Sequence, residues 1–436
     1  MNKKILHIAI PSIISNITVP LLALVDTTIA GHLGKASYIG AIAVGGMLFN
    51  MAYWLFGFLR MGTGGLTAQA YGAGNQRESM LVLLRSLSVA IVVSAVLIVL
   101  QRPIIELAFR FITATPEVAQ YAHLYFNILI WGAPAVLGLY GFTGWFLGMQ
   151  NARVPMAIAI MQNVVNIAVS AMLVLAFGWK VEGIAAGTLV AQYAGFLTAV
   201  VVFLRKYRPH LPHVRWREVT NRVAFKKFFG VNRDIFFRTF CLIAVSSYFT
   251  TAGSTQGELI LAANTLLMQF FTLFSYLFDG FSYAGEAIGG QYYGAKNREE
   301  FCALTRSLFK WGIGLVIAFT LVYIAFGNAI LSLLTDSTAV LAQAANYLLY
   351  AYCIPLVSFC AFLYDGLFIG STATRYMLIS MLAASVLFFV IISVFPLTNH
   401  VLWVAFLAYL GCRGVVQAFL YPKLTKKMLK TCNVRN

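Results

Sequence analysis

The amino-acid sequence predicts an all-α polytopic membrane protein with twelve transmembrane helices in two parallel six-helix bundles. Three observations support this fold class: the apolar composition, the distribution of basic residues among the loops, and an internal repeat. Of the 436 residues, 60% are hydrophobic and only 10% are charged, with a mean hydropathy of +0.82. Soluble domains carry about 25% charged residues, so this chain has too little polar surface to cover a globule in water.

Apolar segments long enough to cross about 30 Å of hydrocarbon recur along the chain. The first follows Lys3 and Lys4, but it exceeds the apolar core of about 7–15 residues in a secretory signal, so we expect a retained membrane helix. The predicted spans are 5–30, 38–71, 81–100, 118–147, 155–177, 183–204, 231–252, 259–293, 303–325, 341–369, 378–396 and 401–421.

Basic residues distinguish the two sides of the membrane. The loops on one side, with both termini and the polar linker at 205–227, carry 22 Lys and Arg residues. The other side carries four, at Lys35, Arg102, Arg110 and Lys180. Cytoplasmic loops are enriched in Lys and Arg, so we expect both termini inside the cell. Orientation and attraction to anionic membrane lipid also explain the net charge of +17 better than nucleic acid, and we expect no nucleic-acid partner.

The chain repeats itself at an offset of 222 residues. The segment QAYGAGNQRE from Gln69 aligns with QYYGAKNREE from Gln291, and GWFLGMQNAR from Gly144 aligns with GLFIGSTATR from Gly366. Six spans separate equivalent points, so the halves run in the same direction, as in transporters built from parallel repeats. We therefore expect an N-terminal bundle at 1–204, a cytoplasmic linker at 205–227 and a C-terminal bundle at 228–436.

Four acidic residues fall within predicted spans and away from the span ends: Asp26, Asp279, Glu286 and Asp365. A charged carboxylate at mid-membrane costs roughly 2.5–3.5 kcal/mol on insertion scales, and such groups usually mark an ion or substrate route. Removal from water favours the protonated form of a carboxyl group, which suits proton uptake and release.

The first of these acids, Asp26, lies in a span that also contains Pro11 and Pro20. Each proline removes a backbone donor and tends to kink a helix, so we expect this span to bend there. The alternative is that Asp26 only pairs with a neighbouring helix.

In the eighth span, Asp279 and Glu286 are seven residues apart and share a helix face with Tyr276 and Tyr283. This strip suits an organic cation, through charge and cation–π attraction. The alternative is a buried polar network with Arg233, Arg238 or Arg413. Asp365 leaves two interpretations open, a substrate site or pairing near a helix end.

Asn163 and Asn166 lie three residues apart in the fifth span, with Ser170 one turn further. Amides in lipid need partners, so these residues either join Asp26 or hold helices together. Neither the six cysteines nor the six histidines form a ligand pattern, and we expect no metal, cofactor or disulfide framework. No convergent catalytic set is present, so we do not expect an enzyme.

The chain resembles the multidrug and toxic compound extrusion (MATE) transporters over its whole length, and within them the DNA-damage-inducible F (DinF) branch. The motifs that carry the resemblance are SNITVPLLALVDTTIAGHLG from Ser15, GLTAQAYGAGN from Gly65, NRDIFFR from Asn232, FDGFSYAGEAIGGQYYGA from Phe278 and YDGLFIG from Tyr364. The resemblance implies a V-shaped, MATE-like pair of bundles that alternates between inward- and outward-open states in the bacterial cytoplasmic (inner) membrane.

Residue by residue, Asp26 matches the family's proton-coupling aspartate, and Pro11 matches the proline around which the helix is proposed to bend. Asn166 and Thr188 match polar positions near that aspartate. Ser170 departs from the pattern, because relatives often have a second acid there, and this weakens a Na⁺ site.

We therefore expect a monomeric, proton-coupled antiporter that exports organic, often cationic or amphiphilic compounds, with Asp26 as coupling carboxylate. One alternative is a Na⁺-coupled exporter. The other is a flippase for lipid or lipid-linked precursors, and a strongly basic cavity would favour this flippase.

Overall fold

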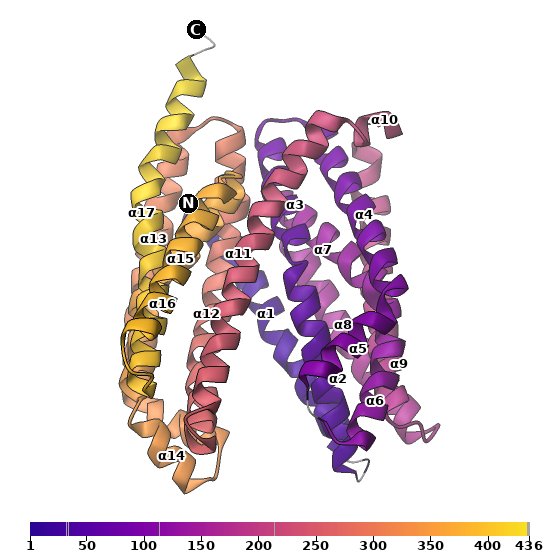
Figure 1. Ribbon diagram of the computed structural model, residues 1–436. Coiled ribbons are helices and arrows are strands. Elements are labelled where there is room, and N and C mark those ends of the chain that lie inside the picture. The colour runs from indigo at the N-terminus through magenta and orange to yellow at the C-terminus, as the bar shows by residue number, and fades with distance from the viewer. Residues whose placement is uncertain (32, 34, 113, 213, 434–436) are drawn as a thin grey trace. The chain divides into compact units, whose positions relative to one another are not determined.

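The computed structural model describes the chain except residues 32, 34, 113, 213 and 434–436, and except the side chains at 19, 21–23, 36, 111 and 429–433. The described residues are helical with short connections and include no β-strand (Figure 1). They divide into two compact units. The N-terminal unit comprises Ile14–Ala70 and Asn75–Phe229, and the C-terminal unit comprises Met1–Ile13, Tyr71–Gly74 and Gly230–Asn436.

The first helix, α1 (Asn2–Gly31), contributes to both units. It runs unbroken through Pro11 and Pro20, and its membership changes between Ile13 and Ile14, directly after the first proline. The predicted bending position is therefore also the place where α1 passes from one unit to the other.

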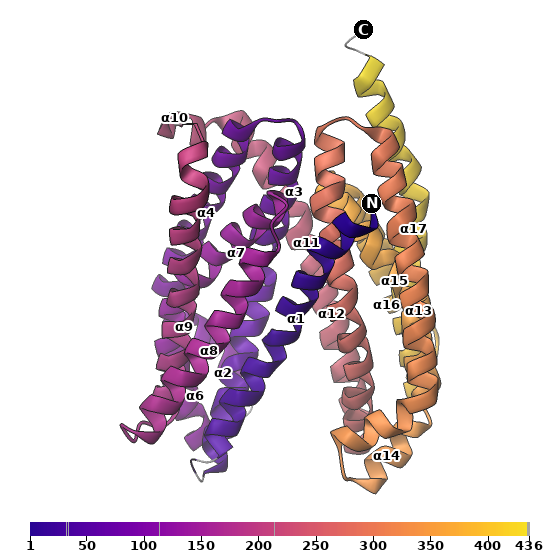
Figure 2. The same ribbon diagram turned by 180° about the vertical axis from the view of Figure 1, so that it is seen from behind.

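In the N-terminal unit, α8 packs along α9, α4 along α7, and α2 along α6 (Figures 1 and 2). The elements that follow α1 are α2 (Ala36–Leu55), α3 (Phe58–Gly72), α4 (Gln76–Val99), α5 (Gln101–Phe111), α6 (Pro116–Leu129), η1 (Ile130–Gly132), α7 (Ala133–Gly148), α8 (Arg153–Leu175), α9 (Val181–Val202), η2 (Phe203–Tyr207), η3 (Arg208–His210) and α10 (Trp216–Val219).

In the C-terminal unit, α12 packs along α15, and both α15 and α16 pack on α17. The elements are α11 (Arg222–Ser254), α12 (Glu258–Gly294), α13 (Arg298–Leu334), α14 (Thr338–Ala345), α15 (Leu348–Gly370), α16 (Thr374–Val394) and α17 (Asn399–Asn433).

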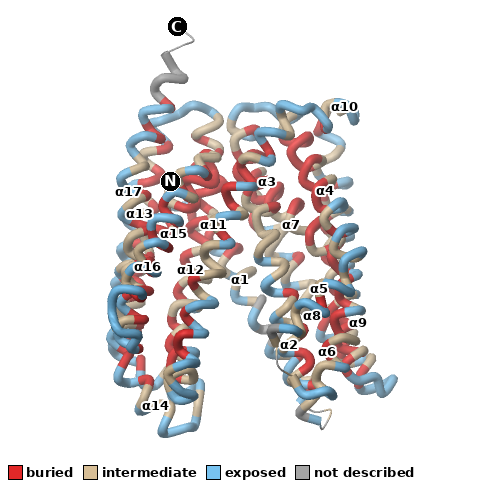
Figure 3. Tube along the Cα trace, viewed as in Figure 1, coloured by how far each residue is buried: buried red, intermediate tan, exposed pale blue. Residues whose placement is uncertain are grey.

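Eleven helical segments of the described residues are long and apolar enough to cross a membrane, and they coincide with the second to twelfth predicted spans. The first predicted span is α1. Two local differences appear. The tenth span begins at Leu348 and not at 341, because α14 forms a separate short helix, and α5 was not predicted. Large apolar side chains such as Val99, Leu175 and Leu333 are 78–85% exposed. Figure 3 shows exposed positions on many of the helices, as expected of a protein surrounded by lipid.

The internal repeat is present in the helix crossings. A Cβ atom added at Gly144 of α7 would lie 2.1 Å from the carbonyl oxygen of Arg60, and one at Gly366 of α15 would lie 2.1 Å from that of Ser282. These pairs are equivalent at the 222-residue offset. Both crossings therefore require glycine, which lets the two helix backbones touch.

The repeat extends to the helix ends. Asn75 accepts a hydrogen bond from Glu78 N at 3.0 Å, and its counterpart Asn297 accepts one from Glu300 N at 3.1 Å. An asparagine at this position satisfies a backbone N–H that the helix leaves unpaired. The two short turns before these caps also match, because Gly74 and Lys296 both have positive φ, 68° and 58°.

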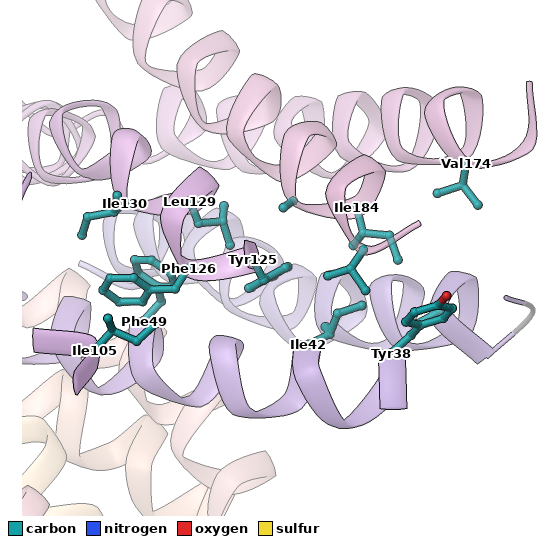
Figure 4. Close-up of a cluster of buried hydrophobic side chains, with 13 residues drawn as sticks. Tyr38, Ile42, Phe49, Ile105, Tyr125, Phe126, Leu129, Ile130, Val174 and Ile184 are labelled. Atoms are coloured by element: carbon teal, nitrogen blue, oxygen red, sulfur yellow. The ribbon is translucent and has the colours of Figure 1, made fainter. Parts of the chain in front are cut away.

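A cluster of buried apolar side chains holds α2, α6 and α9 together in the N-terminal unit (Figure 4). Tyr125 of α6 lies in this cluster with Ile42 and Ile184. A Cβ atom at Gly45 of α2 would lie 2.5 Å from the Tyr125 ring, so glycine makes room for it. This packing fixes the part of the unit that contains Asp26.

Candidate functional site

Asp26 of α1 is buried, with 5% of its surface exposed. Thr188 Oγ1 of α9 lies 3.4 Å from Asp26 Oδ2, and Asn166 Nδ2 of α8 donates to Thr188 Oγ1 at 2.9 Å. The ring of Tyr125 lies beside this group, with its hydroxyl close to Thr188 and Asp26. Four helices of the N-terminal unit thus meet at one buried carboxyl group.

This cluster has more acceptors than donors. The single hydroxyl proton of Thr188 has two acceptors in reach, Asp26 Oδ2 and the carbonyl oxygen of Ile184 at 3.0 Å, and it serves one at a time. Within the described part of the chain, Asp26 Oδ1 and Asn166 Oδ1 are buried without a hydrogen-bond partner. A proton bound to Asp26 would supply a donor that the cluster lacks. Unpaired buried acceptors are costly, and a proton on Asp26 would let this side chain donate to one of them.

Asn163 and Ser170 lie on the same helix but have other surroundings. Asn163 Nδ2 donates to the carbonyl oxygen of Thr18 in α1 at 3.0 Å, so it ties α8 to the helix that carries Asp26. Ser170 is fully buried against Gly187, where an added Cβ atom would lie 2.1 Å from Ser170 Oγ. The sequence predicted Asn163 and Asn166 as one polar face, and the structure assigns them different partners.

The strip predicted in the eighth span lies on α12 of the C-terminal unit. Tyr276, Asp279 and Tyr283 are partly exposed, whereas Glu286 is 1% exposed. Gly280, next to Asp279, contacts the beginning of α1, because a Cβ atom there would lie 2.8 Å from the carbonyl oxygen of Ala9. The accessible part of the strip is therefore Tyr276 to Tyr283.

Asp365 of α15 is the centre of a charged cluster. Its Oδ2 accepts hydrogen bonds from Arg238 of α11 at 2.5 Å and Arg413 of α17 at 2.8 Å, and its Oδ1 accepts one from Gln417 at 2.6 Å. Asp365, Arg413 and Gln417 are at most 4% exposed. Two guanidinium groups face one carboxylate, so the cluster has an excess positive charge. Of the two interpretations of Asp365, this geometry supports pairing.

The arginines offered as partners for Asp279 and Glu286 bind elsewhere. Arg238 and Arg413 pair with Asp365, and Arg233 pairs with Asp234 at 3.1 Å. Asp234 is itself 7% exposed and accepts a hydrogen bond from Thr374 of α16 at 3.2 Å. Asp234 lies near the start of the predicted span 231–252 and was not among the four acids selected from the sequence. The signal was present, because NRDIFFR places three charges at the start of an apolar span.

No group of three or more His, Cys, Asp or Glu side chains among the described residues could hold a metal ion. Five cysteines are free thiols: Cys241, Cys302, Cys353, Cys360 and Cys412. The side chain of Cys432 lies outside the described residues.

A helical membrane protein with a duplicated bundle and a buried, protonatable carboxyl group has the character of a secondary transporter. Comparison with known proteins agrees. The MatE family model matches residues 11–172 and 236–395. The chain is 35% identical over 428 residues to DNA damage-inducible protein F of Escherichia coli strain K12, covering 97% of this chain and 92% of that protein.

Solved structures of MATE transporters have the same fold. One, a MATE transporter in the bent conformation, aligns with a TM-score of 0.86 at 18% identity over 99% of this chain and 96% of that one. Another, a multidrug resistance MATE family transporter in the outward-facing conformation, aligns with a TM-score of 0.85 at 17% identity over 98% and 96%. The chain belongs to the MATE family. It is a multi-pass membrane transporter and not an enzyme.

Proposed function

We propose that this transporter is a proton-coupled antiporter that exports organic, often cationic compounds by alternating access, with Asp26 as the coupling carboxylate. The observation that carries the proposal is the shortage of donors around Asp26. Its hydrogen-bonding neighbours Thr188 and Asn166 are neutral, and no cation pairs with it among the described residues. Protonation therefore changes both the charge and the hydrogen bonding of the site.

The proposed cycle follows from this chemistry. A proton from outside neutralises Asp26 and lets it donate to an acceptor such as Asn166 Oδ1, which rearranges the contacts of α1 with α8 and α9. Substrate then leaves, and deprotonation toward the cytoplasm restores the carboxylate. Asn163, bound to α1 at Thr18, transmits the change to the helix backbone. Pro11 and Pro20 are the proposed bending positions, and the passage of α1 between units directly after Pro11 supports the first of them.

The proposed substrate contacts lie on α12. Tyr276, Asp279 and Tyr283 are partly exposed, and their two rings and one carboxylate suit an organic cation. We place the protein in the bacterial cytoplasmic membrane with both termini inside, as the excess of basic residues on that side supports. The names of its relatives, which include a multidrug resistance transporter, support a broad substrate range.

Transport in liposomes tests the proposal. Purified protein is reconstituted, and uptake of a fluorescent organic cation is followed under a pH gradient and, separately, under a Na⁺ gradient. We expect uptake driven by the pH gradient, and its loss in Asp26→Asn, which keeps the size of the side chain but cannot ionise. Asp336→Asn is the matched control, because Asp336 is an exposed residue in the loop after α13 and is not part of the Asp26 cluster.

Other results would favour the alternatives. Na⁺-driven uptake that survives Asp26→Asn would show Na⁺ coupling through other residues. A protein that transports the cation under neither gradient, but moves a labelled lipid between leaflets, would be a flippase.

A further inference from the structure

A cavity lies at the end of the N-terminal unit where the linker rejoins the helices. Its volume is about 540 Å³, and residues of α3, α4, α10 and the start of α11 line it. Three of the lining side chains are basic, namely Arg85, Arg217 and Lys227. Leu81 and Phe228 provide apolar walls. The proposed transport cycle makes no use of this cavity.

Arg85 builds one wall of the cavity and is 3% exposed. Its Nε donates to the carbonyl oxygen of Val219 at 3.2 Å, and its Nη2 donates to that of Glu218 at 3.1 Å. Both carbonyl groups belong to the last two residues of α10. Arg85 therefore holds α10 on α4, and the cavity has a defined shape.

The acidic lining residues are already neutralised. Glu78 pairs with Arg85 at 2.7 Å. Glu218 pairs with Arg77 through two hydrogen bonds of 2.7 and 2.8 Å, and this guanidinium holds the pKa of the Glu218 carboxyl below its usual value. Arg217 and Lys227 have no ion pair in the described part of the chain. The cavity therefore presents two uncompensated cations.

The remaining polar group is an amide donor. Asn221 Oδ1 caps the start of α11 by accepting from Val223 N at 3.0 Å and Ala224 N at 3.2 Å. Its Nδ2 group is left to donate to a ligand, alongside the two cations. Val223, next to it, is 79% exposed, so an apolar surface adjoins the charged one. Cations, an amide donor and apolar surface together match a ligand with a phosphate at one end and a hydrocarbon chain at the other.

We propose that this cavity binds the headgroup of an anionic phospholipid, with its phosphate on Arg217, Lys227 and Asn221 and its glycerol and first methylene groups against Leu81 and Phe228. Such a lipid would fasten the start of α11 to α4. A basic residue near a membrane surface contributes about 1 kcal/mol to binding of anionic lipid. Loss of both cations is therefore expected to weaken binding about thirtyfold.

Lipid binding to the full-length protein in detergent tests this. Titration with phosphatidylglycerol and with phosphatidylcholine, followed by native mass spectrometry, gives the two affinities. We expect tighter binding of phosphatidylglycerol, and a loss of about thirtyfold in the double variant Arg217→Gln/Lys227→Gln. Arg205→Gln/Lys206→Gln is the matched control, since it removes the same charges from exposed linker residues outside the cavity, and we expect less than about a threefold change.

Three outcomes would overturn the proposal. Equal losses of affinity in the two double variants would show a general effect of net charge. Equal affinities of the wild type for the two lipids would show that the protein does not discriminate by headgroup charge. Displacement of the lipid by an equal concentration of soluble glycerol phosphate would assign the cavity to a free phosphate anion. Unchanged thermal unfolding of both variants confirms that the protein is folded in each comparison.

Discussion

The two halves of the chain share their helix crossings but differ in their polar cores. At the 222-residue offset, Asp26 corresponds to Tyr248 and Asn166 corresponds to Phe388. In the first half these positions belong to a carboxyl–hydroxyl–amide cluster, whereas in the second half the two rings meet edge to face at 6.1 Å. An aromatic contact thus replaces a protonatable group on the same scaffold.

The second half has its own buried acid at another place. Asp365 corresponds to Thr143 of the first half, and its carboxylate accepts from two arginines and a glutamine. The chemistry of a buried carboxyl group depends on whether a positive charge lies next to it. Asp26 lacks a cation among the described residues and gains a donor when it is protonated, whereas Asp365 pairs with two guanidinium groups. We infer that the first acid carries the proton and that the second holds α11, α15 and α17 together.

The largest expected effect is on stability, from Asp365→Asn. The substitution leaves the buried Arg413 and the partly buried Arg238 without a counter-charge, and loss of one partner of a buried ion pair costs about 3–5 kcal/mol. Thermal unfolding in detergent, followed by tryptophan fluorescence, measures the effect. Asp26→Asn, which removes no ion pair, should leave the midpoint nearly unchanged.

A double variant sharpens this prediction. Asp365→Asn/Arg413→Gln restores the original net charge of the cluster, so it should unfold at a higher temperature than Asp365→Asn alone. If Asp26→Asn destabilised the protein as strongly as Asp365→Asn, the distinction between a proton carrier and a structural ion would be wrong.

The shared crossings should respond alike. Gly144→Ala and Gly366→Ala each place a methyl group 2.1 Å from a backbone carbonyl oxygen, and overpacking of this kind costs about 1–3 kcal/mol. We expect similar decreases of the unfolding midpoint in both variants. Gly46→Ala of α2 is the control, because nothing lies within 4 Å of its added Cβ atom. A large effect in only one half would show that the two crossings are not equivalent in energy.

The span positions and the repeat could be predicted because each depends on short, continuous stretches of the sequence. Hydropathy identified the spans, and matching segments such as those at Gln69 and Gln291 identified the halves. The cluster around Asp26 was predicted from the family resemblance, which placed Asn166 and Thr188 near this residue. Tyr125 was missed, because no sequence pattern linked it to the other three residues.

Pairings between distant helices could not be predicted. The ion pair of Arg238 and Asp365 joins residues 127 positions apart, and its formation depends on how the two helices α11 and α15 are rotated. The packing of α10 on α4 could not be predicted either. Arg85 donates to two carbonyl oxygens of α10, and these lie within reach only after the linker has folded against α4. Two short helices were also missed. The predicted span 341–369 merged α14 with the helix that follows it, and α5 lay between two predicted spans because its charged residues lower its hydropathy.

The smallest expected effect is that of the hydroxyl group next to Asp26. Thr188→Val keeps the shape of the side chain but removes the hydrogen bonds with Asp26 and Asn166, and a net contribution of about 1 kcal/mol corresponds to about a fivefold decrease in transport driven by a pH gradient. Thr188→Ser keeps the hydroxyl and should retain most of the activity. Equal activities of the valine and serine variants would mean that Asp26 exchanges its proton without help from α9. The comparison of the halves would then rest on the carboxyl group alone.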